Sequence, residues 1–282
     1  MPRRHPDWVK VRAPGSANYL QLKRILRDRS LHTVCEEARC PNIGECWAHN
    51  TATFLILGDI CTRGCRFCAI GKGKPVLLDP EEPRNVALSV KDLGLQHIVV
   101  TSVDRDDLPD GGSAHFAKTV FWIKSLNPGI RVEVLIPDFK GDESAVETVV
   151  RSGIDVLNHN VETVPRLYKK VRPGSVYQRS LDVLKAAKSI RAEVLTKSGL
   201  MLGVGEAMDE VMATLRDLRE MKCDIVTIGQ YLQPSTDQLP VERYVTPDEF
   251  QQLKADAQQL GFRHVESGPL VRSSYHAWSH VN

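Results

Sequence analysis

Cys61-Thr-Arg-Gly-Cys65-Arg-Phe-Cys68 places three thiols within eight residues, directly after the apolar run 53–57. Thiols this close cannot all pair as disulfides, and they are one short of a closed four-cysteine zinc site. Three soft thiolates suit an iron–sulfur cluster in which one iron keeps a position for another ligand. A zinc loop completed by a distant fourth ligand is the alternative.

The C-x3-C-x2-C spacing of this group resembles the signature of radical S-adenosylmethionine (SAM) enzymes. The resemblance implies that the open iron binds the methionyl end of SAM. It also implies that the aromatic residue just before the third cysteine, here Phe67, lies near the adenine.

A second cysteine group, Cys35, Cys40 and Cys46, precedes the apolar run with C-x4-C-x5-C spacing. It too is one ligand short of four. Pro41 and Gly44 predict a loop rather than a helix here. Six thiolates exceed what one cluster needs, so the two groups imply two clusters. A single shared site is the simpler alternative.

Short β-rich runs alternate with helical patterns from residue 53 onward, which predicts βαβ crossovers and a parallel sheet. Six such units fall short of an eight-stranded barrel. The expected fold class is therefore α/β, a partial (β/α)6 TIM-like barrel. The strands are expected at 53–57, 97–101, 131–136, 155–158, 193–202 and 224–228, and the helices near 85–93, 114–125, 143–152, 180–189 and 209–221.

The sequence shows no internal repeat, low-complexity segment or linker, so we expect one domain with an extension at each end. Thr246-Pro-Asp-Glu249 is a capping box that begins a last helix. The expected parts are an N-terminal extension with the auxiliary cysteine loop (1–50), the barrel (51–262) and a C-terminal extension carrying Arg272-Ser-Ser-Tyr275 (263–282).

The composition is ordinary for a soluble globular protein, with 42% hydrophobic and 26% charged residues. No apolar run approaches the roughly 18–20 residues that span a bilayer, and the start lacks the apolar segment of a secretory signal. Six of the seven cysteines cluster between positions 35 and 68. This pattern indicates metal ligands kept reduced in a cytoplasm rather than a secreted disulfide framework.

A net charge of +2 argues against a nucleic-acid binder that relies on bulk electrostatics. Residues 1–30 nevertheless hold eight Lys or Arg against two Asp. This basic segment, with Arg24 and Arg27, is either a solvated face or a docking surface for an acidic partner protein.

In parallel α/β folds, ligands bind beyond the carboxyl ends of the strands. Polar residues or glycine follow four expected strands, which predicts a central pocket for cofactor and substrate. The alternative to a role in the pocket is, for Asp104, Asp106 and Asp107, that they are helix-capping charges. For His159 the alternative is a core histidine whose ring nitrogens are hydrogen-bonded within the fold. The side chains expected to bind the cofactor are Phe67, Thr101, Asp104, Asn160, Glu162, Lys197 and Gln230.

The two cysteine groups, Thr101-Ser-Val-Asp-Arg-Asp-Asp107, Asn158-His-Asn160 and the tail Arg272-Ser-Ser-Tyr275 together resemble the lipoyl synthase family. The resemblance runs from about Trp8 to Ala277. It implies that SAM, cleaved by one electron from the cluster on the first group, yields methionine and a 5′-deoxyadenosyl radical. That radical takes hydrogen from C6 and C8 of an octanoyl chain, and one SAM is consumed per sulfur inserted.

The resemblance also implies catalytic roles for Cys61, Cys65, Cys68 and Ser274. Cys35, Cys40, Cys46 and Ser274 would hold a second [4Fe–4S] cluster that gives up its own sulfides. The residues alone do not separate Ser273 from Ser274, and the choice rests on the family pattern.

The implied partners are an octanoylated lipoyl carrier domain and a reduced electron donor such as ferredoxin or flavodoxin. The carrier would be a 2-oxoacid dehydrogenase E2 or the glycine cleavage H protein, and neither nucleic acid nor a membrane is expected. The alternatives are another two-cluster radical SAM enzyme, such as biotin synthase or an RNA methylthiotransferase, and a zinc-binding structural protein. An RNA-acting enzyme would be expected to bring an RNA-binding module, and none fits after residue 261.

Overall fold

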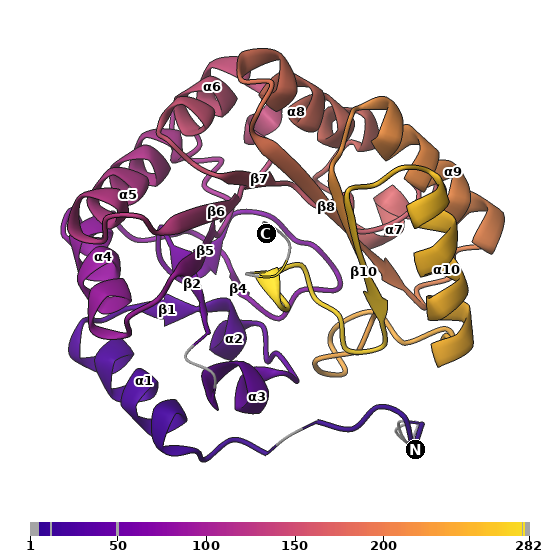
Figure 1. Ribbon diagram of the computed structural model, residues 1–282, viewed down its shortest axis with the longest axis horizontal. Helices are drawn as coiled ribbons and strands as arrows, with labels where there is room; N and C mark the ends of the chain where they lie inside the picture. Colours follow the sequence, from indigo (N-terminus) through magenta and orange to yellow (C-terminus); the bar gives the residue numbers. More distant parts are fainter. Residues whose placement is uncertain (1–5, 12, 49–50, 278, 280–282) are drawn as a thin grey trace.

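A curved, open sheet of eight strands forms the centre of the computed structural model, which describes residues 6–11, 13–48, 51–277 and 279 (Figure 1). Each strand from β2 to β10 is parallel to its neighbour, whereas β1 is antiparallel to β2. In order across the sheet the strands are β1 (His32–Thr33), β2 (Thr53–Ile56), β5 (His97–Ser102), β6 (Arg131–Leu135), β7 (Val156–Asn158), β8 (Leu195–Leu202), β9 (Ile225–Gln230) and β10 (His264–Gly268).

Helices cover the outer face of this sheet (Figure 1). All six expected strands and the expected helices are confirmed, and β10 adds a seventh parallel strand after α10. The prediction stopped at six because β10 is short and lies in the segment assigned to the C-terminal extension. The long helices are α1 (Ala17–Asp28), α4 (Glu82–Asp92), α5 (Ser113–Leu126), α6 (Glu143–Arg151), α8 (Tyr177–Ile190), α9 (Met208–Glu220) and α10 (Pro247–Gln259).

The strands are buried on both faces, as expected of a parallel sheet covered by helices. The inner face also holds a charged pair. The ammonium of Lys197 lies 2.9 Å from a carboxylate oxygen of Glu133, and both side chains are fully buried. At the edge of the fold, Thr246 and Glu249 form the predicted capping box of α10.

The second cysteine group is more helical than predicted. Cys35 lies in α2 (Val34–Glu37) and Cys46 in α3 (Ile43–Ala48), and only Cys40 lies in the connecting turn. The loop prediction was wrong for the two outer cysteines. Thr33 caps α2, accepting from the amide of Glu36 at 3.3 Å, and α3 begins at Ile43, after Pro41, and includes Gly44. The remaining short elements are β3 (Ile60–Cys61), β4 (Gly71–Lys72), α7 (Tyr168–Val171), η1 (Phe139–Gly141) and η2 (Pro165–Leu167).

The basic N-terminal segment is partly neutralised within the fold. Arg27 lies 2.6 Å from Glu36 and Arg29 lies 2.5 Å from Asp92. Among the described helices, none is both long and apolar enough to cross a bilayer. Arg3, Arg4 and Arg12, which the sequence analysis also counted, lie outside the described residues.

Candidate active site

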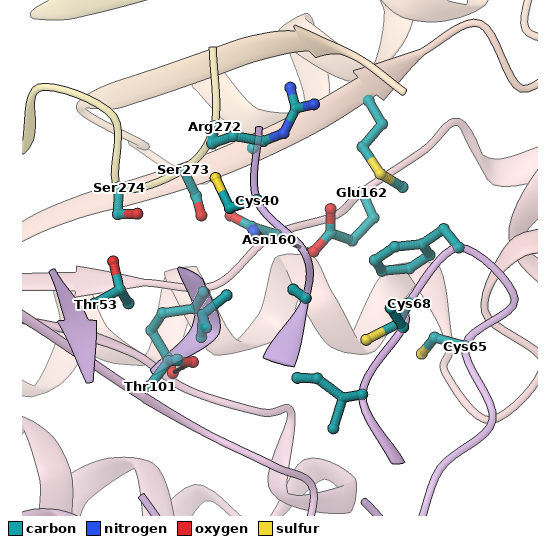
Figure 2. A pocket seen from close by; sticks show the side chains of 18 of the residues that line it. Cys40, Thr53, Cys65, Cys68, Thr101, Asn160, Glu162, Arg272, Ser273 and Ser274 are labelled. Atoms are coloured by element: carbon teal, nitrogen blue, oxygen red, sulfur yellow. Dashed lines mark hydrogen bonds between the residues drawn. The ribbon is translucent and has the colours of Figure 1, made fainter. Parts of the chain in front are cut away.

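A cavity of about 480 Å³ lies at the carboxyl ends of the parallel strands. Its wall includes Thr101 from β5, Gly199 from β8 and Gln230 from β9. In the view of Figure 2, Cys65 and Cys68 lie to one side and Ser274 to the other, with further polar side chains between them. Members of both cysteine groups line this one cavity: Cys35, Cys40, Cys61, Cys65 and Cys68.

Arg63 holds the first cysteine group against the strand ends. Its guanidinium makes two hydrogen bonds of 2.8 Å to Asp106 and lies 2.7 Å from the fully buried carboxylate of Asp138. These acids follow β5 and β6, so one buried arginine ties the cysteine loop to two strands. The backbone amides of Arg63 and Asp104 each lie 3.4 Å from the sulfur of Cys61. Two amide donors at one sulfur suit a thiolate.

Two further segments clamp the same loop. The amide of Arg66 donates to the carbonyl of Val171 at 2.9 Å, and the carbonyl of Arg66 accepts from the amide of Leu239 at 3.0 Å. The side chain of Gln238 donates to the carbonyl of Cys68 at 3.3 Å. The loop that carries Cys61, Cys65 and Cys68 is therefore fixed from several sides by its backbone.

The tail after β10 lies against the second cysteine group. The side chain of Asn42 donates to the carbonyl of Leu270 at 2.7 Å, and the hydroxyl of Tyr275 donates to Glu45 at 3.1 Å. A cavity of about 20 Å³ separates the two segments. Cys35, Cys40, Cys46 and Ser274 all line it, whereas Ser273 lines only the larger cavity.

The donor chemistry fits an iron–sulfur cluster at each group. Burial raises the pKa of Cys35, Cys46 and Cys61 to about 12 and that of Cys68 to about 11. Buried thiols lose their protons when a cationic centre binds them. Among the described residues, no three His, Cys, Asp or Glu side chains form a site for a single metal ion.

Six of the seven residues expected to bind the cofactor line the large cavity, and Lys197 does not. Its ammonium is bound instead to Glu133. The amide of Gln230 is also occupied by the backbone, because it accepts from the amide of Val245 at 2.8 Å and donates to the carbonyl of Leu202 at 3.1 Å. The six that line the cavity are Phe67, Thr101, Asp104, Asn160, Glu162 and Gln230.

Asn160 and Glu162 form a polar pair in the cavity wall (Figure 2). The amide of Asn160 donates to Glu162 at 3.0 Å, while its own oxygen is buried without a described partner. Burial raises the pKa of the Glu162 carboxyl. A buried acceptor without a donor is costly, so this pair has unused capacity for a bound polar molecule.

His159 has the contacts of a satisfied core histidine. One ring nitrogen lies 2.8 Å from the carbonyl of Ile136 and the other 3.0 Å from the hydroxyl of Ser180. Burial and the neighbouring charge of Arg172 lower its pKa to about 4, which keeps the ring neutral near pH 7.

The three aspartates after β5 do not cap the helix that follows them. Asp106 binds Arg63, and Asp107 accepts from Arg105 at 2.8 Å. The N-cap residue of α5 is Gly112, and the side chain of Asp110 accepts from the amides of Gly112 and Ala114 at the start of this helix, at 3.0 and 2.9 Å.

Arg172 is a cavity residue that the sequence analysis missed. Its guanidinium is buried, and it donates to the carbonyl of Asn160 at 2.8 Å while its Nε has no described partner. It lies near Cys65, Asp104 and Glu162, whose charges raise its pKa although burial opposes that effect. The sequence signal was one basic residue before Pro173, which is common in loops.

Two family models match the chain. That of the radical SAM superfamily covers residues 55–218, and that of the N-terminal domain of lipoyl synthase covers residues 2–40. Curated lipoyl synthases match nearly the whole chain. That of Roseiflexus sp. (strain RS-1) is 57% identical over 99% of this chain and 93% of its own. That of Rubrobacter xylanophilus is 58% identical over 96% of this chain and 85% of its own.

The chain belongs to the lipoyl synthase family. It is therefore a radical SAM enzyme whose cofactors are SAM and [4Fe–4S] clusters. This membership sets aside biotin synthase, the RNA methylthiotransferases and the zinc-binding structural protein.

Solved structures at low identity match the fold alone. Streptococcus suis SuiB bound to S-adenosylmethionine has a TM-score of 0.62 at 13% identity, covering 81% of this chain and 54% of that one. Methylornithine synthase has a TM-score of 0.53 at 16% identity, covering 89% and 82%. Both support the partial barrel expected from the sequence.

Proposed function

We propose that this chain inserts two sulfur atoms, at C6 and C8 of an octanoyl group on a carrier lysine, and that each cysteine group holds its own [4Fe–4S] cluster. The observation that carries this proposal is the position of the tail. Ser274 lies with Cys35, Cys40 and Cys46 around the small cavity, and the large cavity lies between that group and the first one. A substrate chain in the large cavity can thus meet both groups.

Cys61, Cys65 and Cys68 are the proposed ligands of the SAM-binding cluster. When bound, the clusters supply the electron that cleaves SAM and the sulfur that enters the product. The chain's own contribution is to fix the loop through Arg63 and to offer polar contacts from the cavity wall.

Arg172, Asn160 and Glu162 are the proposed polar contacts of SAM, together with Phe67 for its adenine. SAM carries a carboxylate, for which the buried guanidinium of Arg172 with its open Nε is a fitting partner. SAM also carries ribose hydroxyls and an ammonium, which can donate to the unpartnered oxygen of Asn160 and to the carboxyl group of Glu162.

Ser274 is the proposed fourth ligand of the second cluster. A serine oxygen is a harder donor than a thiolate and holds iron less firmly, which suits a cluster that must release sulfide. In this arrangement residues 1–50 and the tail after β10 act together as the auxiliary-cluster unit, and residues 51–268, which include β10, act as the SAM-binding barrel.

A lipoyl carrier protein and a reductant follow from family membership in general terms. We further assign the carrier to an octanoylated 2-oxoacid dehydrogenase E2 domain or the glycine cleavage H protein. The electron donor is assigned to a ferredoxin or flavodoxin, and the compartment to the cytoplasm.

The deciding experiment measures iron and sulfide in anaerobically reconstituted protein, beside a Cys35→Ala/Cys40→Ala/Cys46→Ala variant. We expect about eight irons to fall to about four, with SAM cleavage retained and lipoyl product lost. Cys223→Ala is the matched control, because Cys223 is buried between α9 and β9 and should leave about eight irons. Four irons or fewer in the wild type would overturn the two-cluster assignment.

A further inference from the structure

The mouth of the large cavity is marked by basic residues. Among the described residues that line the cavity, only Arg39 and Lys72 are exposed to solvent. Neither side chain forms an ion pair with a described residue, unlike Arg27 on α1 and Arg29 directly after it. Lys74 is exposed two residues beyond Lys72. The entrance therefore presents positive charge that the fold itself does not neutralise.

An apolar pair follows these lysines on the same loop. Leu77 is 96% exposed and Val76 is 70% exposed, the two highest values among the large hydrophobic side chains described. Single exposed hydrophobic residues are ordinary, but two adjacent ones on the loop that follows the cavity-lining Lys72 indicate a binding surface.

The loop that carries this pair is held in place by its backbone. The carbonyl of Val76 accepts from the buried guanidinium of Arg105 at 3.2 Å, and the amide of Gly73 donates to the carbonyl of Cys61 at 3.1 Å. Leu78, the next residue, packs against the core. Because the backbone is anchored on both sides, the exposure of Val76 and Leu77 is imposed by the fold.

We propose that Arg39, Lys72, Lys74, Val76 and Leu77 form a rim surface that docks the octanoylated carrier protein. This inference rests on the proposed function, since that reaction requires a protein to bring its acyl-lysine to the cavity mouth. The carrier face around the lysine would be acidic, with an apolar patch for Leu77. Asp79, the acidic residue farther along the loop, is turned to its own backbone, accepting from the amide of Glu81 at 2.9 Å.

This surface replaces the basic α1 face as the docking site. On α1, Arg27 is already paired with Glu36, and neither Arg24 nor Arg27 lines the cavity. On the rim, Arg39, Lys72 and Lys74 form no ion pair with a described acid, and Arg39 and Lys72 line the cavity itself. Charge at the rim would speed encounter and set the register, while the apolar pair would supply the buried contact.

The test titrates fluorescently labelled octanoylated H protein with the anaerobically reconstituted enzyme and measures Kd by anisotropy. We expect Leu77→Ser and Lys74→Glu each to raise Kd about tenfold. Lys74→Glu should also flatten the salt dependence of binding. Phe121→Ser on α5, which replaces a 61% exposed apolar residue, and Lys185→Glu on α8 are the matched controls and should leave Kd unchanged.

Unchanged Kd in both rim variants would overturn the docking surface. So would a rim that instead controls binding to vesicles of anionic phospholipid, or self-association of the enzyme, without affecting the carrier. Product formation by the wild type at saturating carrier separates this failure from that of the proposed function. If the wild type makes lipoyl product, the function stands whatever the rim variants do.

Discussion

Ser273 and Ser274 carry adjacent hydroxyls with different surroundings. Ser274 lines the small cavity together with the three cysteines of the second group, whereas Ser273 lines only the large cavity. Replacing Ser274 with alanine removes the proposed oxygen ligand. We expect its iron content to fall from about eight toward about four, whereas Ser273→Ala should keep about eight. Iron and sulfide assays on the two reconstituted variants check this. Equal loss from both would contradict the assignment.

Single residues also show where reasoning from the sequence ends. Both cysteine groups could be found because their spacing is itself the chemical signal. Lys197 was assigned to the cofactor and Arg172 was missed, because the role of a charged residue depends on where its side chain ends. Lys197 points to Glu133 inside the sheet, and Arg172 is carried into the cavity by the turn after α7. Neither position follows from local pattern.

The Glu133–Lys197 pair links β6 to β8 inside the sheet. Although burial opposes its charge, Lys197 holds the pKa of Glu133 at about 2, below its ordinary value of 4.5. Lys197→Met removes the lysine partner of this buried carboxylate, which keeps, among the described residues, only the amide of Asn158 at 3.0 Å and the ring of His97 at 3.7 Å. The free energy of unfolding in urea should fall by about 3–5 kcal/mol. The double variant Lys197→Met/Glu133→Met should lose less free energy of unfolding than Lys197→Met alone, because it buries no carboxylate without a lysine partner. A double variant less stable than the single one would show that the pair itself stabilises the sheet.

The Glu133–Lys197 pair also makes the stability of the fold depend on pH, in a direction that the shifted pKa determines. Because the pKa of Glu133 is lower in the folded state, its contribution to stability is complete above about pH 4.5 and is lost as the pH falls toward about 2. The difference in unfolding midpoint between the wild type and Glu133→Gln should therefore be constant from pH 7 to pH 5 and should shrink below pH 4.5. A difference that stays constant down to pH 3 would contradict this.

The tail can reach the second cysteine group only because β9 carries a glycine. A Cβ on Gly229 would lie 2.1 Å from the carbonyl oxygen of Val271, a contact that must push the tail away. Gly229→Ala should lose about four irons, because Ser274 moves with the tail, while SAM cleavage persists. Gly268→Ala is the control, since its Cβ would make an ordinary 3.5 Å contact with Val271. Full iron content in Gly229→Ala would refute this role of the tail.

At the level of elements, the central strands were predictable because short runs rich in apolar β-branched residues rarely form any secondary structure other than a buried strand. The elements missed or misjudged were short. β1, at two residues, has no periodicity to detect, and α2 and α3 are too brief for a helical pattern to outweigh Pro41. β10 is held by pairing with β9, a partner distant in sequence.

For the molecule as a whole, the clusters should contribute to stability as ligands of the native state. A group that binds only the folded chain raises its unfolding temperature. Chelation of iron should lower the midpoint of the thermal transition measured by circular dichroism. The Cys35→Ala/Cys40→Ala/Cys46→Ala variant should show a smaller drop on chelation than the wild type, because one cluster is already gone. Identical midpoints with and without iron in the wild type would contradict this.

The contacts between the tail and the second cysteine group join residues far apart in the chain: Asn42 and Leu270 are separated by 228 positions, and Glu45 and Tyr275 by 230. During synthesis on the ribosome, the three cysteines emerge first and wait until β10 and the tail have followed. The second site is therefore the last to be completed, after the barrel has been made. A chain whose translation stops before the tail would have the proposed SAM-binding residues but would lack Ser274, the proposed fourth ligand of the second cluster. Iron bound at the second cysteine group would therefore indicate that translation had reached the tail.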